Sequence, residues 1–566
     1  MARFIERKPI AKGDADFEAN RQKLVQDVLD KIPQELVLPA KYIDNPPLDV
    51  TGIPAGCGFL SPEELEITEN YSLTDLVQAI ASKKLTSVAV TKAFARRACI
   101  AHQLTFCLTE LYMNEAIAQA EKLDKHLQTT GQVLGPLHGV PISIKEMVPV
   151  KNQLGSLGLM ATRHIDEQDC LLVQILRDAG AVFYVKTHQP TAVFSMESMS
   201  ALGRTLNPHN LDLAPGGSSG GEGALIAMKG SVLGVGTDIG GSIRIPAAYS
   251  GLYGLKGSHG FWPTEGLVAG PFPPGLQLHG IIGPMARSLW DVDYVNRVVS
   301  ASKPWLRDPE CLPVPYSGLG ARGEQKPLKI GILKDYGLVQ PQPPAAKAID
   351  WAQKQLEQAG FSTTPFEFFD PKRAHDLYCS VLIADGWTTI DSTLTSSGQP
   401  TPPILDKILR MVYASCDPSV ATRGKEQPAS VIALNKFKKD TYCSEFLKSW
   451  IEQGDPDIVI APMSPACAHD TGLLELNVSQ THLWNLLDYP GLVVPTPFKV
   501  EEKGAYSKAE YEDSPAKGGW DRKAKEDWKK ADFVGAPVAL QILARRRMEG
   551  ELMEAVGRIA DALKLK

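Results

Sequence analysis

The chain has 566 residues, of which 43% are apolar and 22% charged, with a net charge of −6 and a pI of about 6.1. This is the composition of a globular protein that is long enough to bury a large core. The slightly acidic balance argues against nucleic acid or an anionic membrane as a partner, so we expect a neutral or modestly polar small molecule instead.

The first 70 residues are expected to form a helical arm and a loop, followed by a single domain over residues 71–566. Apolar residues recur at helical spacing between Phe17 and Ile32, and five prolines between residues 33 and 54 then break regular structure. The next helix is predicted to begin at Leu73, because Ser72 and Asp75 have the spacing of a capping box.

From residue 86 onward, predicted helices alternate with short apolar strands. Further helices are predicted after Thr86 and over residues 114–127, 170–180, 223–229 and 345–359. Strands are predicted over residues 140–144, 181–185, 231–236, 329–333, 457–462 and 491–495. This alternation indicates an α/β fold with a mostly parallel or mixed sheet.

Two stretches depart from the alternating pattern. Residues 370–450 are expected to form a largely helical cover region, interrupted by a segment rich in Ser, Thr and Pro at 392–403. Residues 501–532 are dense in charges of both signs and are expected to form a charged surface excursion.

Targeting signals and cysteines point to one location. The N-terminus lacks the apolar stretch of a secretory signal, no run is long enough to span a bilayer, and the last residues match no lipidation or peroxisomal motif. The nine cysteines are scattered and form no Cys-x-x-Cys pair, as expected for free thiols in a reducing compartment. We therefore expect a cytoplasmic protein without a bound metal.

Two glycine-rich clusters carry the candidate chemistry. The first reads Gly-Gly-Ser-Ser-Gly-Gly-Glu at 216–222, and the second reads Gly-Thr-Asp-Ile-Gly-Gly-Ser-Ile-Arg-Ile-Pro at 236–246. Glycines allow consecutive backbone amides to face one point, where they can stabilise an oxyanion beside Ser242. Neither cluster has the residue order of a phosphate loop, and both are embedded in strand and helix patterns, which argues against a linker.

A serine nucleophile needs a base, and Lys145 is the candidate. It follows the apolar strand predicted at 140–144, and strand ends are where α/β enzymes place functional groups. A desolvated lysine can be a neutral amine and accept a proton.

A second interpretation stays open. Residues 216–220 also match Gly-x-Ser-x-Gly, which would make Ser218 the nucleophile of an α/β-hydrolase elbow. That interpretation needs a downstream histidine, and by chain order the candidates are His259, His279, His375, His469 and His482.

These segments together resemble the amidase signature family. Residues 214–246 resemble its signature block, residues 135–146 its lysine segment, and later family landmarks match residues 461–465, 485–490 and 535–541. The likeness covers roughly residues 71–563 and has the character of fungal acetamidase-like general amidases. It implies the amidase signature fold, a central mixed, largely parallel twisted sheet flanked by helices, with residues 71–566 as the catalytic domain.

The resemblance also implies roles for individual residues. Ser242 matches the nucleophile, Ser218 the bridging serine after a cis peptide bond, and Lys145 the base of a Ser–cis-Ser–Lys triad. The oxyanion-hole positions match Ile239, Gly240 and Gly241. The supporting positions match Ser219, Thr237, Asp238 and Arg244. A substrate-binding position matches Val193.

The reaction implied is hydrolysis of small carboxylic amides through an acyl-enzyme, without metal or cofactor. Carbamates or esters could react at the same centre. The alternatives are an enzyme like the glutamine-hydrolysing component of an amidotransferase, which would need a partner, and an idle scaffold. The pocket walls are expected to come from residues 196–200, 370–450 and 484–489. The resemblance also implies a homodimer, with the N-terminal helix as a contact.

Overall fold

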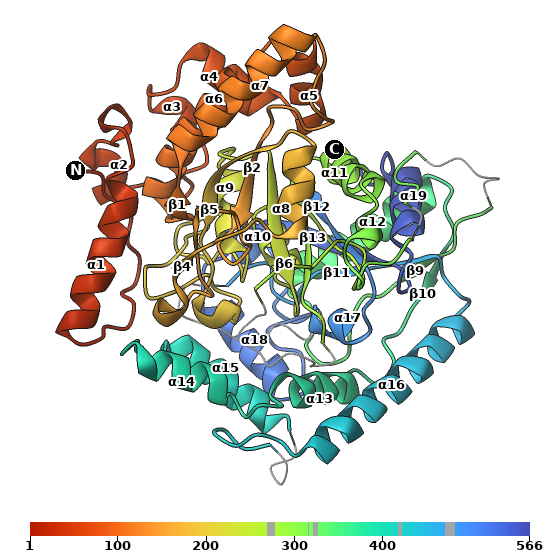
Figure 1. Cartoon of the computed structure of the whole chain (residues 1–566). Coiled ribbons are helices and arrows are strands. Elements are labelled where there is room, and N and C mark those ends of the chain that lie inside the picture. The colour runs from red at the N-terminus through yellow and green to blue at the C-terminus, as the bar shows by residue number, and fades with distance from the viewer. Residues whose placement is uncertain (269–277, 315, 321–325, 417–420, 470–480) are drawn as a thin grey trace.

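The computed structural model describes residues 1–566 except 269–277, 315, 321–325, 417–420 and 470–480. Its centre is an 11-stranded sheet with helices packed around it (Figure 1). In spatial order the strands are β1 (Leu108–Leu111), β5 (Val182–Thr187), β2 (Pro141–Lys145), β6 (Leu233–Asp238), β8 (Ile281–Ala286), β7 (Tyr253–Lys256), β12 (Gly491–Lys499), β13 (Pro537–Leu543), β11 (Ile458–Pro462), β9 (Ile330–Ile332) and β10 (Thr363–Pro365). A separate small sheet pairs β3 (Leu154–Gly155) with β4 (His164–Ile165).

The expected mixed sheet flanked by helices is confirmed. Among the described strands, parallel pairing is confined to two runs, β5–β2–β6 and β11–β9–β10. The remaining neighbours, including β6–β8, β7–β12 and β12–β13, are antiparallel and outnumber the parallel pairs. The sheet is therefore less parallel than expected. The expectation took the helices between predicted strands as crossover connections of parallel pairs, but antiparallel neighbours need no such connection.

The helices predicted along the first 360 residues are present with small shifts of their ends. They comprise α1 (Ala15–Leu29), α5 (Leu73–Ala81), α6 (Ser87–Thr105), α7 (Met113–Thr130), α8 (Leu171–Asp178), α9 (Gly220–Ala227) and α12 (Pro343–Gln358). At α5 the capping box is formed in both directions, because Ser72 accepts from the Asp75 amide and Asp75 accepts from the Ser72 amide. Further helices that the periodicity did not predict are α2 (Ala40–Asp44), α3 (Ile53–Gly56), α4 (Pro62–Asn70), α10 (Arg244–Tyr249), α11 (Leu289–Ala301), α17 (His482–Leu486) and α19 (Glu549–Ile559).

The N-terminal 70 residues pack on the rest of the chain through apolar contacts. Buried side chains from this segment, among them Leu36, Val50 and Ile67, belong to the same hydrophobic cluster as the buried residues of α6. The backbone is also joined, since the Ile5 amide donates to the Gln103 carbonyl at 2.9 Å. In Figure 1, α1 and α2 lie along one side of the molecule, beside α3 to α7.

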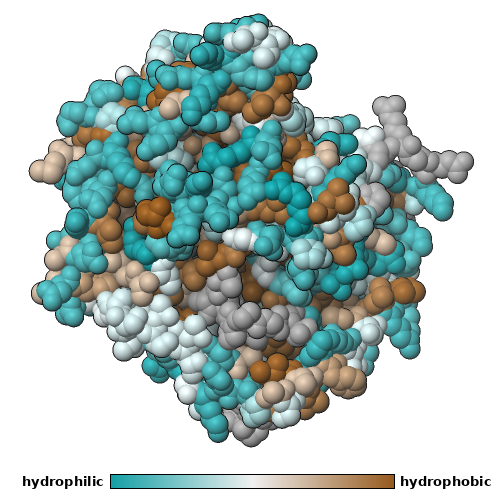
Figure 2. Space-filling view, in the orientation of Figure 1, coloured by the Kyte–Doolittle hydropathy of each residue, from teal (hydrophilic) through white to brown (hydrophobic). Residues whose placement is uncertain are grey.

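Residues 370–450 form four helices at one end of the molecule (Figure 1), apart from residues 417–420, which lie outside the described residues. These helices are α13 (Pro371–Leu382), α14 (Thr388–Ser396), α15 (Pro403–Ala414) and α16 (Ala429–Glu452). Figure 2 shows apolar side chains at the lower right of this face of the molecule. Helix α16 carries the exposed apolar residues Leu434, Phe437, Leu447 and Ile451. None of the helices in the described part of the chain is both long and apolar enough to cross a bilayer.

The charge-rich segment 501–532 includes α18 (Gly519–Lys530). One face of this helix is buried, with Trp528 2% exposed and packed in parallel against Phe533. The Asp521 carboxylate is also buried and accepts from the Gln340 and Lys517 amides at 2.9 and 2.8 Å. The segment is therefore joined to the rest of the chain through its buried face.

Candidate active site

The ends of two parallel strands bring Lys145 and the second glycine cluster together. Lys145 is the last residue of β2, and the next strand in the sheet, β6, ends at Asp238. Strands β2 and β6 run parallel, with Ile144 opposite Val235, so both chains leave the sheet at the same edge. The loop that follows β6 carries Ser242.

The Lys145 amine is fully buried and lies among hydroxyl groups. Its Nζ lies 2.7 Å from Ser218 Oγ and 2.9 Å from Thr237 Oγ1. Burial lowers the pKa of Lys145 to about 7, even though the carboxyl groups of Asp238, Glu222 and Glu146 act in the opposite direction. Near neutral pH a large share of this amine is therefore uncharged and able to accept a proton.

The first glycine cluster places Ser218 directly before α9. The peptide bond between Gly217 and Ser218 is cis, and Ser218 is completely buried. The two clusters are joined at the backbone, since the Ser219 amide donates to the Ser242 carbonyl at 3.1 Å. The Ser219 hydroxyl lies 3.3 Å from the Thr237 amide. The structure thus brings Lys145, Ser218 and the loop of Ser242 into one place.

The loop between β6 and Ser242 contains the three matched oxyanion positions. Ile239 and Gly240 line the same cavity as Ser242. The Gly241 amide instead donates to Asp238 Oδ1 at 2.8 Å, and Gly241 has a φ of +125°, which favours glycine. Gly241 therefore secures the turn, while Gly240 borders the open space.

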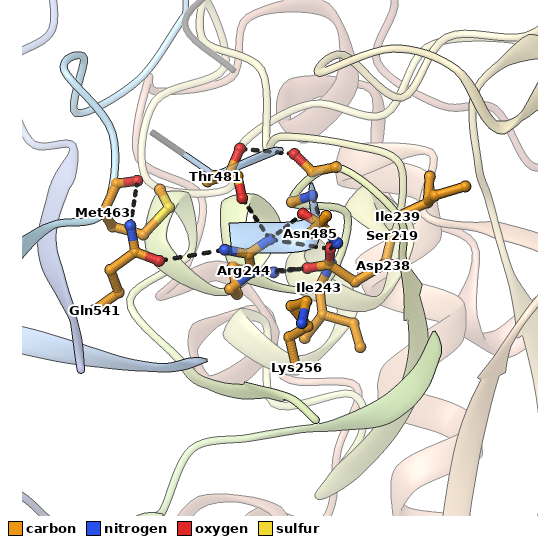
Figure 3. A network of polar contacts seen from close by, with 12 residues as sticks. Ser219, Asp238, Ile239, Ile243, Arg244, Lys256, Met463, Thr481, Asn485 and Gln541 are labelled. Carbon is orange, nitrogen blue, oxygen red and sulfur yellow. Dashed lines mark hydrogen bonds and ion pairs between the residues drawn. The ribbon is translucent and has the colours of Figure 1, made fainter. Parts of the chain in front are cut away.

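A buried ion pair anchors this loop (Figure 3). Arg244 Nε lies 3.0 Å from Asp238 Oδ2, and both side chains are fully buried. Burial alone would raise the pKa of Asp238, but the Arg244 guanidinium and the Lys256 ammonium hold it well below its ordinary value. Arg244 also donates to the Asn485 side chain at 2.6 Å and to the Thr481 carbonyl at 3.0 Å. The pair therefore connects the loop that follows β6 to α17.

The cavity beside Ser242 is small and mostly apolar, with a volume of about 60 Å³. Its lining residues are Val193, Phe194, Ser195, Met196, Gly217, Ile239, Gly240, Ser242, Ile245, His375, Tyr378, Cys379, Leu382, Ile408, Val412 and His482. The matched position Val193 is among them, as is Met196 from the expected wall at 196–200. The cover helices α13 and α15 contribute further walls. The expectation that residues 484–489 line this cavity is wrong, because α17 contributes its first residue, His482, instead.

Glu222 is a buried acid that the sequence analysis did not single out. It is fully buried and accepts from the Ser143 and Thr187 hydroxyls at 2.5 and 3.0 Å. Burial raises the pKa of Glu222 to about 8, while the Ser143 and Thr187 hydroxyls act in the opposite direction. Its place in the first cluster was visible in the sequence, but its contacts with β2 and β5 were not.

Three further residues from distant segments contact the loop that follows β6. Tyr378 donates to the Ile239 carbonyl at 3.1 Å, Thr481 donates to the Gly240 carbonyl at 2.7 Å, and the Asn485 amide donates to Asp238 Oδ1 at 2.9 Å. Asn485 stands in one of the matched family landmarks, which was the available signal. No sequence pattern pointed to Tyr378 or Thr481.

The histidines of the elbow interpretation have other partners. His375 and His482 share a hydrogen bond at 2.9 Å, His469 pairs with the Tyr249 hydroxyl at 3.0 Å, and His259 stacks on His279. Ser218 instead lies at hydrogen-bond distance from Lys145. This geometry favours the lysine over a histidine as the partner of Ser218.

Comparison with known proteins gives consistent matches along the chain. The family model described as Amidase matches residues 89–553. Acetamidase of Emericella nidulans is 35% identical over 530 residues, covering 90% of this chain and 92% of the relative. Acetamidase of Aspergillus oryzae is 33% identical over 545 residues, covering 93% and 96%.

Solved structures agree with the sequence relatives. The chain superimposes on fatty acid amide hydrolase with a TM-score of 0.86 at 31% identity, over 98% of this chain and 97% of that one. A bacterial aryl acylamidase of the amidase signature enzymes matches at a TM-score of 0.66 and 21% identity, over 87% and 96%. The second likeness concerns the fold alone.

Proposed function

The chain belongs to the amidase signature family and is an amide hydrolase, and from this premise we propose that it cleaves small carboxylic amides through an acyl-enzyme on Ser242. The observation that carries the proposal is the buried Lys145 amine 2.7 Å from Ser218 Oγ, beside the loop of Ser242. An uncharged amine in this position can act as the base that a serine nucleophile needs.

In the first half-reaction, Lys145 accepts a proton from Ser218, which in turn takes the hydroxyl proton of Ser242. Ser242 Oγ attacks the amide carbon, and the carbonyl oxygen becomes an oxyanion next to Ile239 and Gly240. The Lys145 ammonium then returns its proton through Ser218 to the amide nitrogen, the C–N bond breaks, and the amine or ammonia leaves. This return matters because an amide nitrogen is a poor leaving group unless it is protonated.

In the second half-reaction, water replaces the amine. Lys145 and Ser218 take a proton from the water, which attacks the acyl carbon of the Ser242 ester. The oxyanion forms again at the same loop and collapses with release of Ser242 and the carboxylic acid. Thr237 Oγ1 lies 2.9 Å from the Lys145 amine and holds it in place in both steps. The Asp238–Arg244 ion pair keeps the loop that carries Ser242 in place.

The cavity supports a small acyl group as the preferred substrate. Its volume of about 60 Å³ leaves room for a few heavy atoms, and its walls offer apolar side chains such as Leu382 and Ile408. A panel of acetamide, longer aliphatic amides, benzamide and ethyl carbamate tests this proposal. We expect the highest kcat/KM for short aliphatic amides, and a preference for benzamide or for the carbamate would contradict it.

We also propose a cytoplasmic location and a homodimer. The location is supported by the nine cysteines, all of which are unpaired thiols, as in a reducing compartment. Light scattering of the purified chain tests the dimer, with twice the monomer mass of 61.5 kDa as the expected result.

A further inference from the structure

Two hydroxyl groups from distant parts of the chain hold consecutive carbonyls of the nucleophile loop. The Tyr378 hydroxyl, on cover helix α13, donates to the Ile239 carbonyl at 3.1 Å. The Thr481 hydroxyl, directly before α17, donates to the Gly240 carbonyl at 2.7 Å. Both bonds reach the part of the loop that borders the cavity beside Ser242.

A planar trans peptide directs its carbonyl and its N–H to opposite sides, so holding the carbonyl also sets the direction of the following amide. The peptide between Gly240 and Gly241 is held at both ends, by Thr481 at the carbonyl and by Asp238 at the amide. The peptide between Ile239 and Gly240 is held at its carbonyl by Tyr378. Its amide, that of Gly240, consequently faces away from α13.

The Tyr378 side chain is itself firmly placed. Its residue is 5% exposed, and its ring lies against His482 with ring centroids 4.7 Å apart. A Cβ atom added to Gly240 would lie 2.7 Å from the Tyr378 hydroxyl, so the contact depends on glycine at that position. A buried ring with one hydrogen bond to the loop is suited to hold the peptide in one orientation.

We propose that Tyr378 is a positioning residue for the oxyanion hole: it aims the Gly240 amide at the developing oxyanion, and Thr481 holds the adjoining peptide in register. The inference rests on the proposed acyl-enzyme at Ser242. In this arrangement the Gly240 amide serves the oxyanion, whereas the Gly241 amide, which donates to Asp238, secures the loop. Neither hydroxyl needs to touch the substrate.

The test uses a matched pair of inhibitors that differ in their ability to form an oxyanion. A trifluoromethyl ketone with a short acyl group lets Ser242 Oγ bond to the ketone carbon, while the hydroxyl proton moves to Lys145 and the ketone oxygen becomes anionic. The corresponding trifluoromethyl alcohol has the same carbon and fluorine skeleton but cannot accept the nucleophile. The ratio of the two inhibition constants therefore isolates the oxyanion interaction.

We expect Tyr378→Phe to raise the inhibition constant of the ketone and lower kcat by about tenfold, below the roughly 10²–10³-fold loss on removing an oxyanion donor. The alcohol inhibition constant and KM should stay within about twofold of wild type. Thr481→Val should act in the same direction, and Thr481→Ser should restore the wild-type ratio. Tyr442→Phe is the matched control, because Tyr442 donates its hydroxyl to the Phe369 carbonyl at 2.6 Å, a bond of the same kind in another part of the molecule.

Three results would each overturn the inference: equal losses of affinity for the ketone and the alcohol, a Tyr378→Phe enzyme with unchanged constants, or a Thr481→Ser enzyme that behaves like Thr481→Val. The same assays separate it from the proposed function. A wild-type enzyme that turns over amides and binds the ketone, alongside variants that behave identically, contradicts the positioning role alone. A wild-type enzyme that neither turns over amides nor binds the ketone contradicts both.

Discussion

Lys145 Nζ lies 2.7 Å from Ser218 Oγ, although the two residues are 73 positions apart in the sequence. The contact arises because β2 ends at Lys145 and α9 begins just after Ser219, and the two ends meet at the same edge of the sheet. Both groups are fully buried, and burial lowers the pKa of the Lys145 amine to about 7. The predictions below follow from this pair and the loop around it.

Replacing the amine should remove the base without unfolding the chain. We expect Lys145→Ala to lower kcat for a short aliphatic amide by roughly 10²–10⁴-fold, the usual contribution of general acid–base catalysis. Far-ultraviolet circular dichroism should show unchanged helix content. Turnover near the wild-type rate would remove Lys145 from the mechanism.

The pH dependence should report the same amine. Burial lowers the pKa of Lys145 to about 7, and the uncharged form is the base, so activity falls as pH drops and the amine gains a proton. We expect kcat/KM to rise about tenfold per pH unit below pH 7 and to level off above it. A profile that is flat between pH 5.5 and 8 is incompatible with this base.

The ion pair between Asp238 and Arg244 should matter for stability. Arg244→Met leaves the Asp238 carboxylate buried without its cation, which typically costs about 3–5 kcal/mol. The matched control is Lys334→Met, which breaks the exposed pair with Asp350 and should change stability by less than about 1 kcal/mol. Thermal unfolding measures both, and similar midpoints for the two variants would argue against an anchoring role.

Glycine at position 221 should be needed for the packing of α9. A Cβ atom there would meet the His188 amide nitrogen at 2.4 Å and the Cys107 carbonyl oxygen at 2.6 Å, and backbone atoms cannot easily move aside. We expect Gly221→Ala to destabilise the fold by about 1–3 kcal/mol. Gly519→Ala is the control, since nothing lies within 4 Å of its Cβ position, and its unfolding midpoint should not fall. Equal midpoints would contradict the close packing.

Enlarging the cavity should change the acyl preference. Ile408 lines the cavity from α15, whereas Ile404, one turn earlier on the same helix, is buried elsewhere. We expect Ile408→Ala to raise kcat/KM for a longer aliphatic amide relative to acetamide by about tenfold, in the range for one or two methylene groups. The ratio should stay constant in Ile404→Ala. If both variants behave alike, the cavity does not select the acyl chain.

Much of the parallel part of the fold could be predicted from local patterns. The strand that ends at Lys145 and the capping box at Ser72 follow from short-range periodicity and from hydrogen bonds between near neighbours. The strands β7, β8 and β13 were not predicted as strands; β8, for example, contains Gly283 and Pro284, which weaken a strand signal.

The cover region shows where composition was right about a break but wrong about its start. The segment rich in Ser, Thr and Pro was expected to interrupt the helices over 392–403, and the interruption lies between the end of α14 at Ser396 and the start of α15 at Pro403. Hydroxyls inside α14 bond to carbonyls one turn earlier, for example Thr393 to Thr389 and Thr395 to Asp391. Residues that usually compete with helical hydrogen bonds are therefore accommodated within the helix.

The candidate site was predictable in its two glycine clusters and the lysine, and in a few matched positions such as Val193 and Asn485. Their residue types and order carry the chemistry, and the family resemblance assigned them roles. Tyr378 and Thr481 stand 139 and 241 positions from the carbonyls they contact, so only the folded sheet and its cover helices bring them to the loop. The raised pKa of Glu222 likewise depends on burial against β2 and β5, which only the folded chain provides.

Labelling with a serine-directed fluorophosphonate tests the central assignment most directly. Wild-type enzyme should form one covalent adduct, located by peptide mass spectrometry on Ser242, and Ser242→Ala should form none. Ser218→Ala should retain the Ser242 site but react far more slowly, because the relay to Lys145 is cut. Labelling that persists in Ser242→Ala and disappears in Ser218→Ala would contradict the account and assign the nucleophile to Ser218.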